Sequence, residues 1–207
     1  MATAAPRIDW TKYAFFLLLA LATLGVIWVD ERFWIDPTDP NWVHIAPFRS
    51  LLMLRGLLGV TAFVIGPFQF SDRLRRTRPQ VHRWMGRIYV GAIFVSAPIA
   101  TWIGSHLEGP LTRPEQIAQG GGWFLCTAIA LACVLRRNFA LHKAWMMRSY
   151  AFCTIFIVSR VPDLVPGFRW NDALLSTSLW WLIAGALVLP DVVLTFRALT
   201  RRRLGAA

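Results

Sequence analysis

The chain has 207 residues, of which 56% are hydrophobic and only 16% are charged. That proportion exceeds what a soluble domain of this length needs for one core, so the composition predicts an integral membrane protein. The net charge of +11 is also typical of nucleic-acid binders, but here the cations lie in short segments between apolar stretches, which argues against that class.

Six apolar stretches recur along the chain and predict six transmembrane helices. They cover about residues 13–29, 51–70, 84–103, 122–135, 149–161 and 174–196. Stretches of 17 or more residues can cross roughly 30 Å of hydrocarbon at about 1.5 Å per residue. The fourth and fifth are shorter, so we expect them to recruit flanking residues from Gly120 and Trp145. The first, with Ala20-Leu21-Ala22, also resembles a signal peptide, but its apolar residues continue to Val29.

Charged residues predict the orientation of these helices. With the N-terminus in the cytoplasm, 16 of the 22 Lys and Arg residues and three of the 11 acidic residues lie on that side. The two faces then carry about +13 and −2, which is the bias expected when cationic loops stay in the cytoplasm. We therefore expect an all-α membrane domain over residues 1–207 with both termini cytoplasmic.

A repeated motif divides the central part of the chain. Trp-Met-x-Arg-x-Tyr occurs at 84–89 and again at 145–150, and His82 and His142 precede the two copies. Each copy begins a helix that follows a basic loop, so the repeated unit is a helical hairpin, about 49–104 and 120–165. Two parallel hairpins predict a four-helix core of helices 2 to 5 and set both histidines at one depth. Helices 13–29 and 174–196 then flank this core.

The histidine pair is the strongest candidate for a binding site. Two imidazoles that face each other across a bundle can ligate haem iron, with cations near the membrane surface for the propionates. The candidate cofactor-binding residues are His82, His142, Arg83, Arg87, Lys143, Arg148, Gly86 and Ser149. Of these, the two histidines are the metal ligands, and the small Gly86 and Ser149 leave room for a flat ligand.

Other interpretations of the same residues stay open. A quinone would use His82 or His142 as a hydrogen-bond donor, with Tyr89, Tyr150 or Gln69 nearby. Alternatively, the arginines reach lipid headgroups and the histidines only cap helices at the interface. The chain would then be a non-catalytic accessory subunit of a larger membrane complex.

Catalysis on a soluble substrate is not indicated, because the sequence shows no nucleophile with its base, no phosphate-binding glycine loop and no carboxylate pair. A transporter is the weakest alternative, since the centres of the spans hold almost no polar residue that could bind a solute.

Three segments carry a resemblance to a known family. Residues 66–70, 82–89 and 142–151, together with Arg160, resemble the bacterial membrane proteins catalogued as domain of unknown function 2306, over about residues 45–165. That family is similar to transmembrane haem cytochromes of the b-561 type. The resemblance implies an inner-membrane protein that transports electrons through a haem b held by His82 and His142.

The pattern of those cytochromes is matched only in part. Their second haem takes histidines from the second and fourth helices, and here neither span contains one. The remaining histidines, His44 and His106, are both expected on the outer side and are the alternative for a second site.

Overall fold

Helices form all of the regular structure in the residues that the computed structural model describes, which are 10–29, 46–107 and 113–205. The α-helices are α1 (Trp10–Val29), α3 (Arg49–Gln69), α4 (Asp72–Thr77), α5 (Pro79–Leu107), α6 (Arg113–Leu135), α7 (Phe139–Arg160) and α8 (Asp172–Gly205). Two short 3-10 helices, η2 (Ala46–Phe48) and η3 (Val161–Leu164), precede α3 and follow α7. The all-α prediction is confirmed for the described residues.

The helices begin where capping residues stand, several residues before the apolar stretches. Ser71 accepts a hydrogen bond from the Leu74 amide at the start of α4, and Asn138 accepts one from the Leu141 amide at the start of α7. Such side chains satisfy amides that have no partner within the helix. Pro79 opens α5, where its missing N–H is not needed. Consequently the fourth and fifth helices recruit more flanking residues than predicted, from Arg113 and Phe139.

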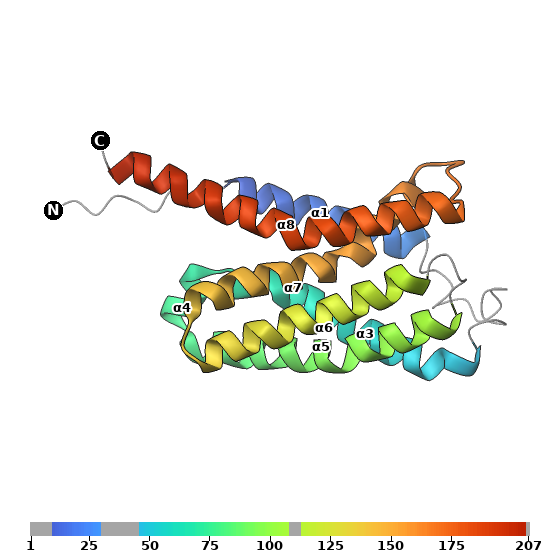
Figure 1. Cartoon of the computed structure of the whole chain (residues 1–207), viewed down its shortest axis with the longest axis horizontal. Helices are drawn as coiled ribbons and strands as arrows, with labels where there is room; N and C mark the ends of the chain where they lie inside the picture. Colours follow the sequence, from blue (N-terminus) through green and yellow to red (C-terminus); the bar gives the residue numbers. More distant parts are fainter. Residues whose placement is uncertain (1–9, 30–45, 108–112, 206–207) are drawn as a thin grey trace.

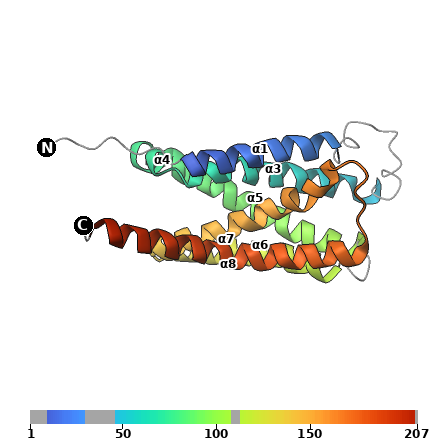
Figure 2. The same cartoon turned by 90° about the horizontal axis from the view of Figure 1, so that it is seen from above.

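Four helices form a bundle in the ring order α3, α5, α6, α7, each packed against the next, with α7 returning to α3 (Figures 1 and 2). Helices α5 and α7 therefore lie diagonally opposite each other and run in the same direction. Helix α1 packs against α7 and η3, whereas α8 packs against α7 and α6. The interior is thus bounded by α3, α5, α6 and α7, and side chains on the inner faces of α5 and α7 meet across it.

The outer surface of the bundle is apolar along its length. Large side chains such as Leu57, Trp181 and Phe196 are 67%, 75% and 72% exposed, which is unfavourable in water but not in lipid. Four helical segments are long and apolar enough to cross a membrane, namely Ala46–Gln69, Pro79–His106, Arg113–Leu135 and Asp172–Phe196. By length and composition, four of the six predicted spans therefore meet this criterion within the described residues.

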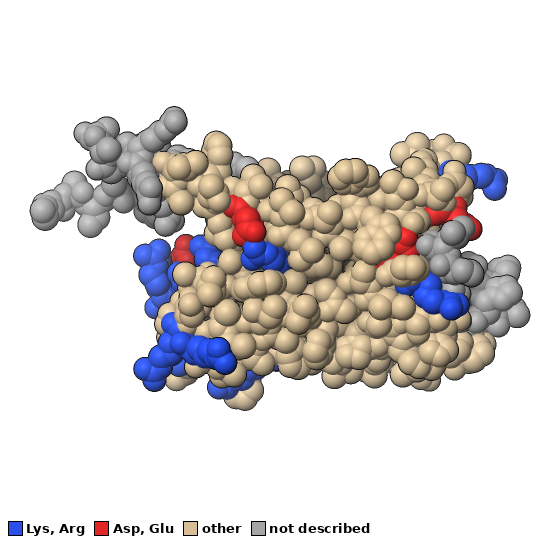
Figure 3. Space-filling model, viewed as in Figure 1, with Lys and Arg blue, Asp and Glu red and all other residues tan. Residues whose placement is uncertain are grey.

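Basic side chains gather at one end of the bundle (Figure 3). This cationic end comprises exposed arginines of α4, of the beginning of α5 and of the α6–α7 turn: Arg73, Arg75, Arg76, Arg78, Arg83, Arg87, Arg136 and Arg137. Helix α1 begins and α8 ends on the same side (Figure 1). Acidic and basic side chains are mixed at the opposite end (Figure 3).

The two central hairpins differ in their connections. Helix α4 joins α3 to α5, whereas a single tight turn joins α6 to α7. In that turn Arg137 has a positive φ of 58°, and the amides of Asn138 and Arg137 donate to the carbonyls of Cys133 and Val134. This is the Schellman arrangement, which satisfies the last carbonyls of a helix and reverses the chain. The turn places His142 close to the end of α6.

Candidate cofactor site between two histidines

His82 and His142 occupy equivalent places at the cationic end, each as the fourth residue of its helix. The amide of His82 donates to the carbonyl of Arg78 at 3.1 Å, and the amide of His142 donates to the carbonyl of Asn138 at 3.0 Å. Each histidine thus closes the first turn of α5 or α7. Both side chains are half-buried.

The direction of both imidazoles follows from residues two turns deeper in the bundle. Tyr89 and Ser149 lie seven positions after His82 and His142, and seven residues are close to two full turns, so each shares the face of its histidine. The hydroxyls of Tyr89 and Ser149 meet across the bundle at 3.0 Å. Each histidine therefore lies on the inward-facing side of its helix, about 10 Å nearer the cationic end.

His142 is held by a hydrogen bond that determines which ring nitrogen is available. Its Nδ1 lies 2.8 Å from the carbonyl oxygen of Ala130 on α6. A carbonyl oxygen only accepts, so Nδ1 carries the hydrogen, and the neutral ring presents its lone pair on Nε2. Metal-ligating histidines are commonly fixed in this way by a backbone carbonyl. The ring of His142 is therefore held in one orientation, and Nε2 is the nitrogen left to interact with another partner.

Around His82, two buried polar atoms have no hydrogen-bond partner among the described residues. They are Nδ1 of His82 and the amide Nε2 of Gln69, the last residue of α3. The other amide atom of Gln69, Oε1, lies 3.3 Å from the position that a Cβ on Gly86 would occupy. Gly86 lies one turn after His82, so the Gln69 amide lies about one turn deeper than His82 along α5. Each such atom costs roughly 1–3 kcal/mol, and a polar ligand here would remove that penalty.

A chain of buried hydroxyls closes this space toward the middle of the membrane. Thr127 donates to the carbonyl of Trp123 at 2.8 Å. Because a hydroxyl carries one hydrogen, Thr127 must accept from Ser149 at 2.7 Å, and Ser149 must in turn accept from Tyr89. All three hydroxyl side chains are fully buried. The sequence analysis expects Ser149 to leave room for a ligand, whereas in the structure its hydroxyl is bonded to Tyr89 and Thr127.

Two of the predicted cations are engaged away from the interior. The guanidinium of Arg148 pairs with the carboxylate of Asp191 on α8, and its Nε donates to the carbonyl of Leu187 at 3.2 Å. Arg148 also lies over the ring of Trp145, 4.7 Å from its centre. Similarly, Arg87 stacks over the exposed ring of Trp84 at 5.0 Å. These contacts are packing and anchoring contacts.

The other predicted residues stay close to the pair. Arg83 and Lys143 directly follow the two histidines, and Arg83 is exposed whereas Lys143 is half-buried. The structure places His82 and His142 at equivalent positions in the first turns of α5 and α7, and Arg83 and Lys143 are their neighbours in the sequence. Of the alternative second site, His106 is exposed, with its Nδ1 2.7 Å from the carbonyl oxygen of Trp102, and His44 lies outside the described residues.

The comparison with protein families agrees with this architecture. A family model described as predicted membrane protein (DUF2306) matches residues 53–197, which run from α3 into α8 and include both histidines. The chain belongs to this family. The family resemblance inferred from the sequence is thereby confirmed, and the DUF2306 protein is a membrane protein. Searches of curated proteins and of solved structures find no match.

A metal ion held by protein ligands alone would need further donors beside the two histidines. No group of three or more His, Cys, Asp or Glu side chains that could hold an ion occurs in the described part of the chain. Haem needs only two axial protein ligands, because the porphyrin supplies the other four nitrogens. An oriented Nε2 on His142 and a buried unpartnered nitrogen on His82 would suit such a group on the cationic side of the hydroxyl chain.

Sequence reasoning missed Thr127, which completes the closure of the site. It belongs to neither copy of the repeated motif, so no pattern linked it to the histidines. The signal available was a hydroxyl in an otherwise apolar span, since polar residues within membrane helices face protein interiors. The sequence predicts Gln69 only as a neighbour of a quinone, and the structure places its amide directly beside Gly86.

Proposed function

We propose that this DUF2306 protein is an electron-transfer protein of the bacterial inner membrane that binds haem b between His82 and His142. The observation that carries the proposal is the equivalent placement of the two imidazoles on diagonal helices, with His142 fixed by Ala130 so that Nε2 is free to ligate. Haem b supplies one-electron chemistry at its iron when it is bound.

The residues around the pair would then take distinct roles. Arg83 and Lys143 are the cations adjacent to the histidines and would balance the propionate charges. The amide nitrogen of Gln69 would donate a hydrogen bond to the ligand and so gain the partner that it lacks among the described residues. The hydroxyl chain of Tyr89, Ser149 and Thr127 separates the site from the opposite half of the bundle, so electrons and ligand would enter from the cationic end.

We also propose the finer topology. Helices α1, α3, α5, α6, α7 and α8 all cross the membrane, and the cationic end faces the cytoplasm, as the distribution of Lys and Arg favours. The hairpins α3–α5 and α6–α7 are parallel repeats, which is supported by the equivalent first turns at His82 and His142. The site would then lie near the cytoplasmic surface.

The deciding experiment is an absorbance spectrum of the protein purified in detergent from cells supplied with a haem precursor. We expect a Soret band and reduced-minus-oxidised α and β bands. His82→Ala and His142→Ala should each abolish them, and the double variant should lose nothing more, because the two ligands act as one unit. His106→Ala is the matched control and should keep the spectrum. Wild-type protein without a Soret band under these conditions would reject haem binding.

A quinone is the second candidate, and the unpartnered nitrogens of Gln69 and His82 favour it specifically. Both groups can donate to a carbonyl oxygen of the quinone ring, and Gln69→Leu would remove one donor. Quinone co-purifying with the wild-type protein but not with Gln69→Leu, in the absence of a Soret band, would select this alternative. If neither cofactor binds, and the chain co-purifies with a larger membrane complex, the accessory-subunit interpretation takes precedence.

A further inference from the structure

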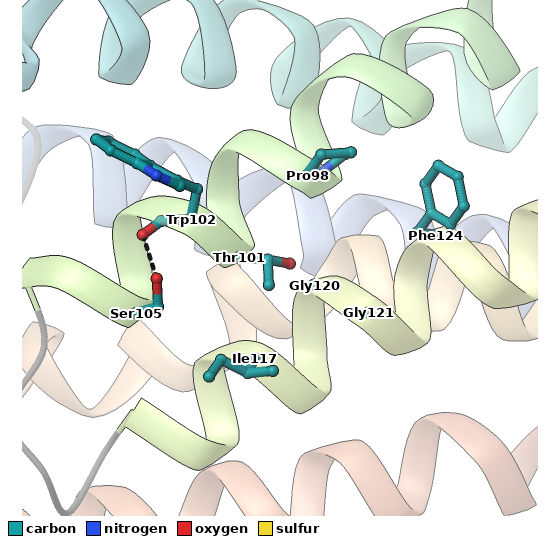
Figure 4. A pocket seen from close by; sticks show the side chains of 8 residues that line it. All are labelled: Pro98, Thr101, Trp102, Ser105, Ile117, Gly120, Gly121 and Phe124. Carbon is teal, nitrogen blue, oxygen red and sulfur yellow. Dashed lines mark hydrogen bonds between the residues drawn. The ribbon is translucent and has the colours of Figure 1, made fainter.

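A groove of about 430 Å³ runs along the seam between α5 and α6, in the half of the bundle away from the cationic end (Figure 4). Gly120 and Gly121 form its floor, and Trp102 and Phe124 stand at its sides. Trp102, Gly121 and Phe124 are exposed. Because these lining residues are exposed, the groove opens outward rather than toward another described helix.

Two glycines with different surroundings create the hollow. A Cβ on Gly120 would lie 2.2 Å from Oγ1 of Thr101, so the two helices approach each other closely at this level. A Cβ on Gly121 would meet nothing within 4 Å. The close approach of α5 and α6 at Gly120 determines how deep the groove is. The absence of a side chain at Gly121 leaves the groove unfilled. Ile117 and Phe124, each about one turn from Gly121, keep the surface raised on either side.

The surroundings restrict what can fill this groove. Both walls belong to segments long and apolar enough to cross a membrane, Pro79–His106 and Arg113–Leu135, so the groove lies at the depth of lipid chains. A packed helix is about 10–12 Å wide and usually docks on small residues spaced four apart. Here the residues four positions before and after Gly121 are Ile117 and Leu125. The groove spans about two turns of each helix, from Pro98 to Ser105 and from Ile117 to Phe124. Because no stripe of small residues four apart runs along it, the groove is suited to a hydrocarbon chain rather than to a helix.

The outer end of the groove has the chemistry of a headgroup site. Ser105 lines this end, and the next residue, His106, is exposed and stacks on Trp102 at 4.4 Å. Arg113, also exposed, lies one turn before Ile117 on α6. A cation and an imidazole beside an indole ring are suited to an anionic phosphate at the membrane interface.

From these features we infer that the α5–α6 groove is a specific phospholipid site, with one acyl chain over Gly121 and the phosphate near Arg113 and His106. The inference does not depend on the haem proposal, because the groove and the histidine pair lie in opposite halves of the bundle. A lipid bound here would fill the surface between α5 and α6 and support their packing.

Gly121→Leu tests the site directly, because a Cβ at this exposed position meets nothing within 4 Å and the rest of the side chain would occupy the groove that Gly121 lines. Gly91→Leu is the matched control: Gly91 is also exposed, also has nothing within 4 Å of a Cβ, and does not line the groove. Each variant is reconstituted in vesicles of phosphatidylethanolamine and phosphatidylglycerol, extracted in mild detergent and analysed by native mass spectrometry.

We expect wild type and Gly91→Leu to retain one phospholipid per chain, and Gly121→Leu to lose it by at least about tenfold, since about two buried methylene groups correspond to that factor. Equal retention in Gly121→Leu, or no retained lipid in wild type, would overturn the inference. A dimer of wild type that Gly121→Leu dissociates would assign the groove to a second copy instead.

Photo-crosslinking of wild type with a diazirine on the acyl chain should label Phe124 or Trp102, and labelling elsewhere only would also overturn the inference.

Discussion

Tyr89 on α5 and Ser149 on α7 join their hydroxyls across the diagonal of the bundle at 3.0 Å. This bond fixes the relative height of two helices that are not adjacent in the ring. Since His82 and His142 each lie seven residues before these positions, the same bond sets the histidines level with each other. The proposed ligand pair therefore depends on a polar contact about 10 Å deeper in the membrane.

Because Tyr89 donates to Ser149, substituting the donor and substituting the acceptor should lower the stability of the protein by different amounts. Ser149→Ala leaves the Tyr89 hydroxyl without its acceptor in a buried place, which costs roughly 1–3 kcal/mol, whereas Tyr89→Phe removes a donor and should cost about 1 kcal/mol. In detergent, the melting temperature should fall by about 2–4 °C per kcal/mol. The double variant should be less destabilised than the sum of the single variants. Equal and additive losses would show that the two hydroxyls do not interact.

Gln69→Leu should raise the stability of the cofactor-free protein and weaken the binding of haem or quinone. The substitution removes a buried amide nitrogen that has no described partner, so the melting temperature of the cofactor-free protein should rise by about 2–4 °C. Binding of haem or quinone should weaken, because the ligand loses a donor. Gln80→Leu, an exposed position in the first turn of α5, is the control and should change neither quantity. A destabilised Gln69→Leu would mean that the amide has a structural partner.

Arg148→Ala tests whether this arginine serves packing or the cofactor. Its contacts with Asp191, Leu187 and Trp145 tie α7 to α8, so we expect a lower melting temperature and an unchanged Soret maximum. Asp191→Asn should reproduce a smaller part of the loss, since this carboxylate is 58% exposed and the pair is screened. A shifted Soret maximum or midpoint potential in Arg148→Ala, with unchanged stability, would place the arginine at the cofactor.

Reporter fusions test the topology. A fusion after Arg76 should report the cytoplasm, and a fusion after Glu108 should report the opposite side, because moving 16 cations outward would oppose the insertion bias. A fusion after Arg137 should agree with the one after Arg76, which tests α5 and α6 together. If Arg76 and Glu108 report the same side, the six-helix topology is rejected.

Local patterns in the sequence determined the class of the fold and the position of its helices. Apolar stretches mark membrane helices because lipid leaves no other partner for backbone polar groups, and every predicted stretch became a helix. The repeated motif also predicted that His82 and His142 lie near the starts of two helices, and each is the fourth residue of its helix, although His82 precedes its motif by two residues and His142 by three. Family membership followed from the same segments.

Only the tertiary structure decided what each helix face meets. The sequence indicated that Ser149 shares a face with His142, but the hydroxyls that fill the space come from Tyr89 and Thr127, 60 and 22 residues away. Likewise, Arg148 occupies the same motif position as Arg87, but it forms an ion pair with Asp191 on α8. Helical periodicity is a property of neighbouring residues, whereas partners and open space depend on which helices become adjacent, and that is set by packing across the whole bundle.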